Sequence, residues 1–197
     1  SWGDFGVVNP IHALGRAIAR LSSYPVPLEP RTSFSVGVVS GGTSVNAIPA
    51  DASCRVDLRS VSAVELARIE QYFRDAVAES VADENRIAAA SGTVLEVAIR
   101  PIGDRPSGET PATAAITRAA VEASLLLGIR TVLDCASTDS NIPISLGLPA
   151  VTLGGGGSGG GTHTLEEWYE PAGRDLGIKR ALLLVVALAD ASEGPSS

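Results

Sequence analysis

The glycine-rich segment from Gly154 to Gly161 limits the folds open to this chain more than any other part of its sequence, because seven of its eight residues are glycine. Glycine loses more conformational freedom on folding than any other residue, so ordering such a run is costly. The segment is either a flexible linker or a place where another group must approach the backbone closely. Thr162, His163 and two glutamates follow it, which is an unusual ending for a linker. Both interpretations stay open.

A histidine held at the end of a glycine loop suits metal binding. Neutral imidazole is a good zinc ligand, and a nearby carboxylate can orient its ring. A lone histidine is more often a core or surface residue without a function, and His12, which lies within a helical pattern, fits that description. The loop setting distinguishes His163, and it is the candidate metal ligand.

The first hundred residues predict a small α+β domain. Asn9 and Pro10 are typical of a helix start, and Ser62 with Glu65 forms a capping box at a second start. Alternating apolar residues predict strands over three segments. These segments are 33–39, 45–60 and 94–102. They predict one antiparallel sheet with helices on one face, whose exposed edges are natural places for a second subunit to pair.

A polar segment, 103–109, predicts a domain boundary. Helices and strands alternate after it, as in α/β domains, but only 131–134 and 149–153 read clearly as strands. Two strands make no well-covered parallel sheet, so we expect the rest of the sheet to come from other sequence. The polar loop 136–141 follows the first strand, where α/β sheets bind ligands; capping of the next helix is the alternative.

Asn46 and Arg59 are the right residue types to hold a carboxylate, since one offers an amide donor and the other a bidentate guanidinium. On the residues alone, the preferred interpretation is a turn asparagine and an exposed strand arginine. The net charge of -7 and the single lysine, Lys179, argue against nucleic acid as a partner. No apolar run reaches the roughly 18 residues of a membrane span, and we expect a cytoplasmic protein.

Five segments together resemble a known family. Gly41–Pro49 with Asp57–Ser60 resembles the dimerisation, or lid, domain of the zinc-dependent aminoacylase and carboxypeptidase-type peptidases. Three later segments resemble the C-terminal catalytic part of the same family, in the same order. They are Ser137–Asn141, Gly147–Gly154 and His163–Trp168. The resemblance covers essentially the whole chain.

The resemblance implies a lid domain over 1–103, with a four-stranded antiparallel sheet and two helices on one face. It implies the C-terminal part of an α/β catalytic domain over 104–197. Such enzymes are homodimers that cleave a peptide or N-acyl amino acid amide bond with water activated by two zinc ions. His163 matches the last metal ligand. The residues matching substrate contacts are Asn46, Arg59, Thr138, Asp139, Gly155 and Gly156.

The departures from the family pattern are as important. The other metal ligands, the general base and the lid histidine have no counterpart in this sequence. We therefore expect a fragment that contains no catalytic residue, binds no zinc by itself, is inactive alone, and packs against a missing N-terminal half of the catalytic domain. The competing interpretation is a non-catalytic dimerising module that binds a carboxylate ligand. A natural homologue that has lost its upstream ligands is a third.

Overall fold

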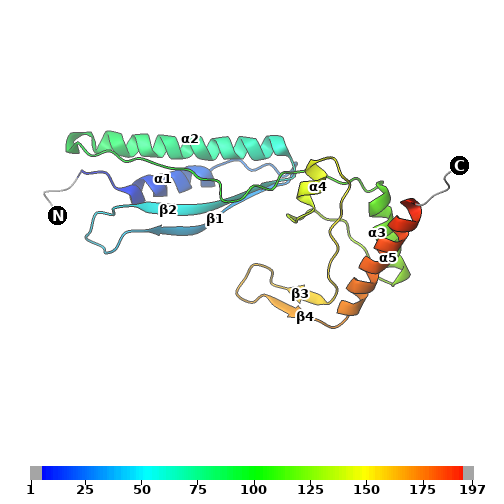
Figure 1. Ribbon diagram of the computed structural model, residues 1–197. Coiled ribbons are helices and arrows are strands. Elements are labelled where there is room, and N and C mark those ends of the chain that lie inside the picture. Colours follow the sequence, from blue (N-terminus) through cyan, green and yellow to red (C-terminus); the bar gives the residue numbers. More distant parts are fainter. Residues whose placement is uncertain (1–5, 193–197) are drawn as a thin grey trace. The chain divides into compact units, whose positions relative to one another are not determined.

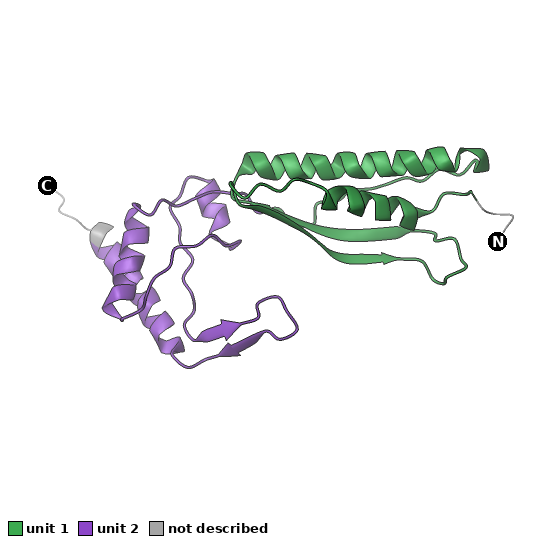
Figure 2. Ribbon diagram, turned by 180° about the vertical axis from the view of Figure 1, so that it is seen from behind, with its two compact units in different colours: residues 1–104 green, residues 105–197 purple. Residues whose placement is uncertain are grey.

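The computed structural model describes residues 6–192. The chain divides into two compact units, Ser1–Asp104 and Arg105–Ser197, which are coloured green and purple in Figure 2. The first unit combines helices with a β-hairpin (Figure 1). Its elements are α1 (Pro10–Ser22), β1 (Thr32–Gly41), β2 (Ala52–Ser60), α2 (Ala63–Ile87) and the 3-10 turn η2 (Ala89–Ser91).

The two helices begin where the sequence predicts them. The side chain of Asn9 accepts hydrogen bonds from the N–H groups of Ile11 and His12, and Pro10 occupies the first helical position. The hydroxyl of Ser62 accepts from the N–H of Glu65 at the start of α2. Helix starts leave N–H groups without a partner inside the helix, and these side chains satisfy them.

The hairpin is antiparallel, with Thr32 opposite Ser60 at its base and Gly41 opposite Ala52 at its tip. A bulge lies between Val36 and Val38. Side chains along β2 alternate between half-buried and exposed, as one-sided covering of a strand requires. The half-buried residues include Cys54, Val56 and Leu58, and the exposed ones include Arg55, Asp57 and Arg59. Both α1 and α2 contact β2.

The expectation of a four-stranded sheet is wrong for the described residues, where the sheet of the first unit contains β1 and β2 alone. The predicted strand 94–102 joins no ladder in that part of the chain. Instead, the amide of Asn85 on α2 pairs with Leu95, accepting from its N–H at 2.7 Å and donating to its carbonyl at 3.0 Å. Alternating apolar residues predict a half-buried segment, but a ladder also needs a neighbouring strand with a free edge.

A polar cluster joins α1 to α2. The carboxylate of Glu84, whose side chain is only 3% exposed, pairs with Arg16 and accepts from the N–H of Asn9 at 2.7 Å. Arg20 donates to Ser80 at 2.8 Å and to Asp83 at 2.6 Å. This hydrogen bond from Arg20 holds the pKa of Asp83 below its ordinary value. The pairing fixes α1 against α2 because buried polar groups are stable only when they have partners.

We expect the Glu84→Gln substitution to lower the free energy of unfolding by about 2 kcal/mol. Breaking a buried pair costs roughly 3–5 kcal/mol, and the cost is smaller here because Arg16 is 31% exposed and can reach water. Urea denaturation followed by circular dichroism measures this. The control is Glu79→Gln, since Glu79 is 67% exposed and lies 3.3 Å from Arg20; we expect a change below about 0.5 kcal/mol. Equal losses in the two variants would contradict the assignment.

The second unit has little sheet and much exposed apolar surface. Its elements are α3 (Ala115–Leu126), α4 (Asn141–Ser145), β3 (Ser158–Gly160), β4 (Trp168–Glu170) and α5 (Arg174–Ser192). Helices α3 and α5 pack together, and β3 pairs with β4. The predicted strands 131–134 and 149–153 have no ladder partner within residues 6–192.

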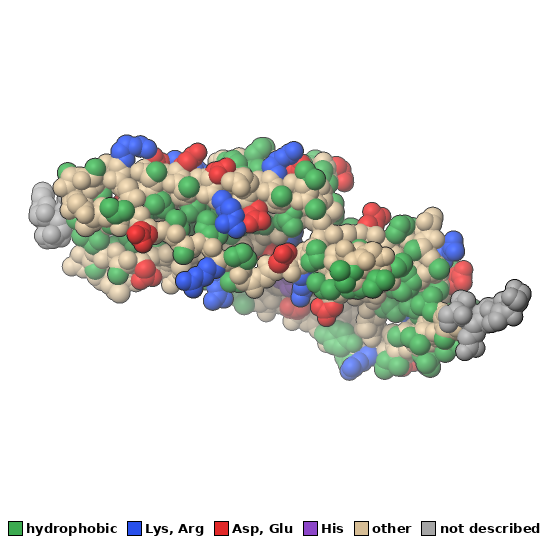
Figure 3. Space-filling view, turned by 45° about the horizontal axis from the view of Figure 1, so that its top comes forward, with side chains coloured by type: hydrophobic (Ala, Val, Ile, Leu, Met, Phe, Trp, Pro, Cys, Tyr) green, Lys and Arg blue, Asp and Glu red, His purple; other side chains and the backbone are tan. Residues whose placement is uncertain are grey.

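Helix α5 exposes apolar side chains on several sides. Ile178, Leu182 and Val185 are 64%, 63% and 64% exposed, and Leu184 is buried. Hydrophobic side chains gather on the surface of the second unit in the view of Figure 3. A helix that is apolar all round is normally a buried helix, so this surface is typical of a face that another part of a protein covers. Among the described residues, no helix is both long and apolar enough to cross a membrane.

Candidate functional site

The glycine-rich segment is packed against the residues that follow it, which argues against a free linker. Gly156 and Gly157 have positive φ angles of 81° and 74°. A Cβ at Gly156 would lie 2.8 Å from the Cα of Arg174, and one at Gly157 would lie 2.5 Å from the carbonyl oxygen of Glu170. A Cβ at Gly177, on α5, would overlap the carbonyl of Gly155. Glycine is therefore required on both sides of this contact.

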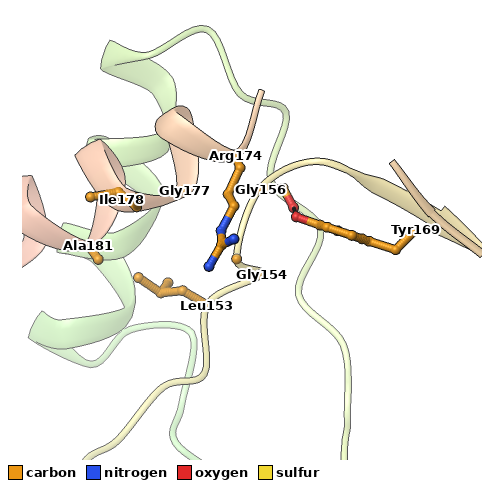
Figure 4. A pocket seen from close by; sticks show the side chains of 9 residues that line it. Leu153, Gly154, Gly156, Tyr169, Arg174, Gly177, Ile178 and Ala181 are labelled. Atoms are coloured by element: carbon orange, nitrogen blue, oxygen red, sulfur yellow. Dashed lines mark hydrogen bonds between the residues drawn. The ribbon is translucent and has the colours of Figure 1, made fainter. Parts of the chain in front are cut away.

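A cavity of about 630 Å³ lies where the glycine-rich segment meets the start of α5. Gly155 and Gly156, two predicted substrate contacts, line it together with Tyr169 and Arg174. In Figure 4 the side chain of Arg174 extends toward Leu153 and Gly154. The hydroxyl of Tyr169 donates to the carbonyl of Gly156 at 3.1 Å. The cavity therefore combines glycine backbone with a guanidinium, a group that binds carboxylates and phosphates.

The polar loop after residue 135 is tied to the strand-like segment that leads into the glycines. The hydroxyl of Thr138 lies 2.8 Å from that of Thr152, and the hydroxyl of Ser140 lies 2.7 Å from the same group. Asp139 is fully exposed and lies 4.0 Å from Arg105. Thr138 and Asp139 are thus beside the chain that enters the glycine-rich segment.

His163 lies in the connection between β3 and β4 and is exposed. Its φ of 66° makes it the one non-glycine residue with positive φ among residues 6–192. Its N–H donates to the carboxylate of Glu167 at 3.3 Å. A non-glycine residue in the left-handed region is uncommon, although histidine is enriched there as asparagine is, and strained backbone conformations cluster at functional sites.

The donors around His163 do not fit a catalytic metal centre by themselves. Catalytic zinc sites use three protein ligands. Within the described residues, no three His, Cys, Asp or Glu side chains form a group that could hold a metal ion. A dinuclear centre therefore needs ligands beyond those that residues 6–192 bring together.

The other two predicted substrate contacts, Asn46 and Arg59, lie at opposite ends of the hairpin. Arg59 is opposite Ser33 near the base, whereas Asn46 lies in the connection beyond the Gly41–Ala52 pair. The seven residue steps from Ala52 to Arg59 correspond to roughly 23 Å of strand. Within one chain, the two side chains are not brought together.

Each of these two side chains has a local partner. Asn46 accepts a hydrogen bond from the hydroxyl of Ser44 at 2.9 Å. Arg59 donates to Asp57 at 2.5 Å, and both of these side chains are more than half exposed. An exposed ion pair of this kind contributes little stability, so the guanidinium can exchange Asp57 for another carboxylate at small cost.

Three residues of the second unit escaped the sequence reasoning. Arg174 and Tyr169 line the cavity, and Arg180 on α5 donates to the carbonyl of Gly154. A run of glycines signals a close approach, but the residues that approach it are more than a dozen positions away. Only the helical spacing of Arg174, Gly177 and Ala181 hints that one face of α5 meets a backbone.

The comparisons with known proteins agree with the resemblance read from the sequence. Residues 5–85 match the family described as peptidase dimerisation domain. No curated protein sequence matches the chain.

Among solved structures, the chain resembles a tripeptidase from Staphylococcus aureus, with a TM-score of 0.67, 21% identity, and coverage of 93% of this chain and 46% of that one. It resembles the aminopeptidase PepT from Bacillus cereus, with a TM-score of 0.60, 21% identity, and coverage of 91% and 44%. It also resembles the Bacillus subtilis protein YxeP, a dinuclear metal-binding peptidase of the M20 family, with a TM-score of 0.53, 20% identity, and coverage of 92% and 46%.

At these identities the likeness establishes the fold, and the chain spans less than half the length of each of these structures. The family match and the fold point to the same group of proteins. Gly41–Pro49 and Asp57–Ser60, from which the lid is predicted, lie within the matched residues. Residues 5–85 therefore match a peptidase dimerisation domain, and the fold of the chain is similar to that of solved peptidases.

Proposed function

We propose that this chain is part of a metal-dependent peptidase or N-acyl amino acid amidohydrolase. Residues 1–103 are its dimerisation domain, and residues 104–197 are the C-terminal part of its catalytic domain. The observation that carries this proposal is the match of residues 5–85 to a peptidase dimerisation domain. Structural likeness to three peptidases over at least 91% of the chain supports it. The substrate is a small peptide or N-acyl amino acid with a free carboxylate, and the location is cytoplasmic.

In this proposal His163 is one ligand of a zinc centre that other residues complete. The positive φ of His163 supports it, because such backbone strain persists where surrounding structure holds a residue for a purpose. We expect the chain alone to hold no catalytic zinc and to be inactive, because a catalytic zinc needs three protein ligands and residues 6–192 bring no such group together.

The missing ligands lie in an N-terminal half of the catalytic domain that covers the apolar surface of the second unit. Two observations support this part. The solved structures that resemble the chain are each about twice its length. Helix α5 exposes large apolar side chains on several sides, more than an isolated soluble domain normally leaves in water.

The separation of Asn46 and Arg59 supports a substrate site built by two subunits. Closed homodimers place the same surface on both sides of a two-fold axis. If the β1 edges of two copies pair antiparallel, the hairpin tip of one protomer lies beside the hairpin base of its partner. Asn46 of one protomer and Arg59 of the other then hold one substrate carboxylate together. Asn46 and Arg59 of the same chain lie too far apart to do so.

The alternative is a non-catalytic dimerising module that binds a carboxylate ligand. The exposed Asn46 and Arg59 favour it, because a carboxylate site needs no metal. Zinc binding at His163 in a protein that supplies the remaining ligands discriminates the two, since a binding module has no use for a strained histidine at the end of a packed glycine segment.

We expect the purified chain to show no peptide hydrolysis above the blank with zinc present, and no stoichiometric binding at micromolar zinc, because one imidazole is too few ligands. Isothermal titration and a dipeptide assay measure this. In a protein that supplies the remaining ligands, we expect His163→Asn to lower kcat/KM at least about 100-fold. Asparagine tolerates positive φ, so this variant removes the imidazole without straining the turn. Substantial turnover by the chain alone would show that the site is misplaced.

A further inference from the structure

Asn141 is the first residue of helix α4, and its side chain joins two segments that are far apart in the sequence. Its Oδ1 accepts a hydrogen bond from the N–H of Thr138 at 2.8 Å. Its Nδ2 donates to the carbonyl of Pro106, 35 residues earlier, at 3.0 Å. Resting on the proposed function, we propose that Asn141 is a positioning residue, which holds Thr138 and Asp139 in place for substrate binding.

Both hydrogen bonds of Asn141 depend on its amide group. The oxygen of an amide only accepts and its NH₂ only donates, so one orientation of the side chain satisfies both the N–H of Thr138 and the carbonyl of Pro106. Asn141 is half-buried, and a partly buried amide is costly to separate from its partners. The amide therefore fixes the backbone of Thr138 relative to Pro106.

Asp139 needs this support because its own side chain has little to hold it. The carboxylate of Asp139 is fully exposed, and the ion pair that it forms with Arg105 spans 4.0 Å. An exposed ion pair does little to fix a side chain. The position of Asp139 is therefore set by the backbone on either side of it, which is held through Thr138 and Asn141.

Helix capping does not explain the polar side chains of the loop 136–141. Helix α4 has five residues, and Ser140, the residue before it, makes no side-chain hydrogen bond to the first turn. The hydroxyl of Ser140 instead lies 2.7 Å from that of Thr152. The polar side chains thus tie the loop to distant segments rather than start a helix.

The segment around Pro106, to which the amide is bound, is itself fixed. Thr110 accepts from the N–H of Ala150 at 3.1 Å and donates to its carbonyl at 2.7 Å. A Cβ at Gly108 would lie 2.5 Å from the Cγ2 of Ile144 on α4, so the segment packs closely against that helix. Pro106 therefore offers the amide a carbonyl whose position does not vary.

Hydrogen exchange of the Thr138 amide, measured by NMR on the purified chain, tests the hydrogen bond on which the proposal depends. We expect Asn141→Ala to speed this exchange at least about 10-fold, because the N–H loses its acceptor. Asn141→Asp keeps an acceptor at the same position, and its exchange should stay within about 3-fold of the unmodified chain. The matched control is Ser145→Ala on the same helix, where the hydroxyl donates to the carbonyl of Ile142 at 2.7 Å. It should also stay within about 3-fold.

In a protein that supplies the remaining metal ligands, steady-state kinetics separate positioning from a purely structural role. We expect Asn141→Ala to raise KM about 10-fold or more and to leave kcat within about 3-fold, because the variant disturbs substrate contacts and not the metal ligand. Asn141→Asp retains the acceptor for Thr138 and should bring KM back to within about 3-fold of the unmodified protein. Circular dichroism checks that the variants are folded.

Unchanged exchange of Thr138 in Asn141→Ala would overturn the inference. The same acceleration in Ser145→Ala or in Asn141→Asp would also overturn it, since neither removes the acceptor. An unchanged KM in Asn141→Ala would remove the inference and leave the proposed function intact. A complete protein that hydrolyses no peptide or N-acyl amino acid would instead contradict the proposed function and, with it, this inference.

Discussion

Replacing Gly177 by alanine should unfold the contact between α5 and the glycine-rich segment, at a cost of about 3 kcal/mol or more. The added Cβ would overlap the carbonyl carbon and oxygen of Gly155 and approach the N of Gly156 to 2.6 Å. These are backbone atoms, which cannot rotate away as a side-chain end would. Gly156 in turn lies against Gly173 and Arg174, so the backbone of the glycine-rich segment has no free space into which it could shift.

The matched control for this variant is Gly155→Ala. Gly155 belongs to the other side of the same contact, but a Cβ placed on it meets nothing within 4 Å and its φ is not positive. We expect Gly155→Ala to change the free energy of unfolding by less than about 0.5 kcal/mol. Chemical denaturation followed by the fluorescence of Trp168, on β4, measures both variants. Similar stabilities would show that the glycine-rich segment is a loose linker after all.

The second large effect concerns the free edge of β1. Val38 and Val39 are 49% and 59% exposed, and they lie on β1 at and just after the register shift between Val36 and Val38. An exposed apolar edge strand is a template for pairing with another chain, and lysine at an edge blocks such pairing. This half of β1 is the surface through which we propose that two copies associate.

We expect the double substitution Val38→Lys and Val39→Lys to raise the dimer dissociation constant at least about 100-fold, equivalent to roughly 2.7 kcal/mol. Because the interface is two-fold, each substituted residue occurs twice in it. The dimer would therefore bring four added positive charges together. Dilution of fluorescently labelled chains measures the constant. The control is Gln71→Lys, which adds charge on the exposed face of α2, away from the β1 edge. It should change the dimer dissociation constant by no more than about 3-fold. Equal weakening by both would contradict an interface at β1.

The helices of this chain could be predicted because their signals are local. Asn9 and Ser62 cap the helices that follow them, and each signal spans four residues. The sheet could not be predicted in the same way. The apolar alternation of 94–102 is real, but whether it forms a strand depends on a partner far away in sequence, and Asn85 satisfies Leu95 instead.

In the candidate site, too, the features with local signals could be predicted and those that depend on distant partners could not. The glycine-rich segment and His163 stand out in the sequence, since both are unusual in composition or setting. What packs against the glycines does not, because Gly177 lies on a separate helix and only its helical spacing from Arg174 and Ala181 hints at a close approach. The separation of Asn46 and Arg59 also follows only from the strand register.

We propose that this chain carries a working dimerisation domain attached to an incomplete catalytic region, and sedimentation equilibrium of the unmodified chain tests this proposal most directly. The chain has a mass of 20.1 kDa, and we expect a species of twice that mass at micromolar concentration, which dissociates when lysine replaces Val38 and Val39. A mass of 20.1 kDa at every concentration, or a dimer that persists in the lysine variant, would contradict the account.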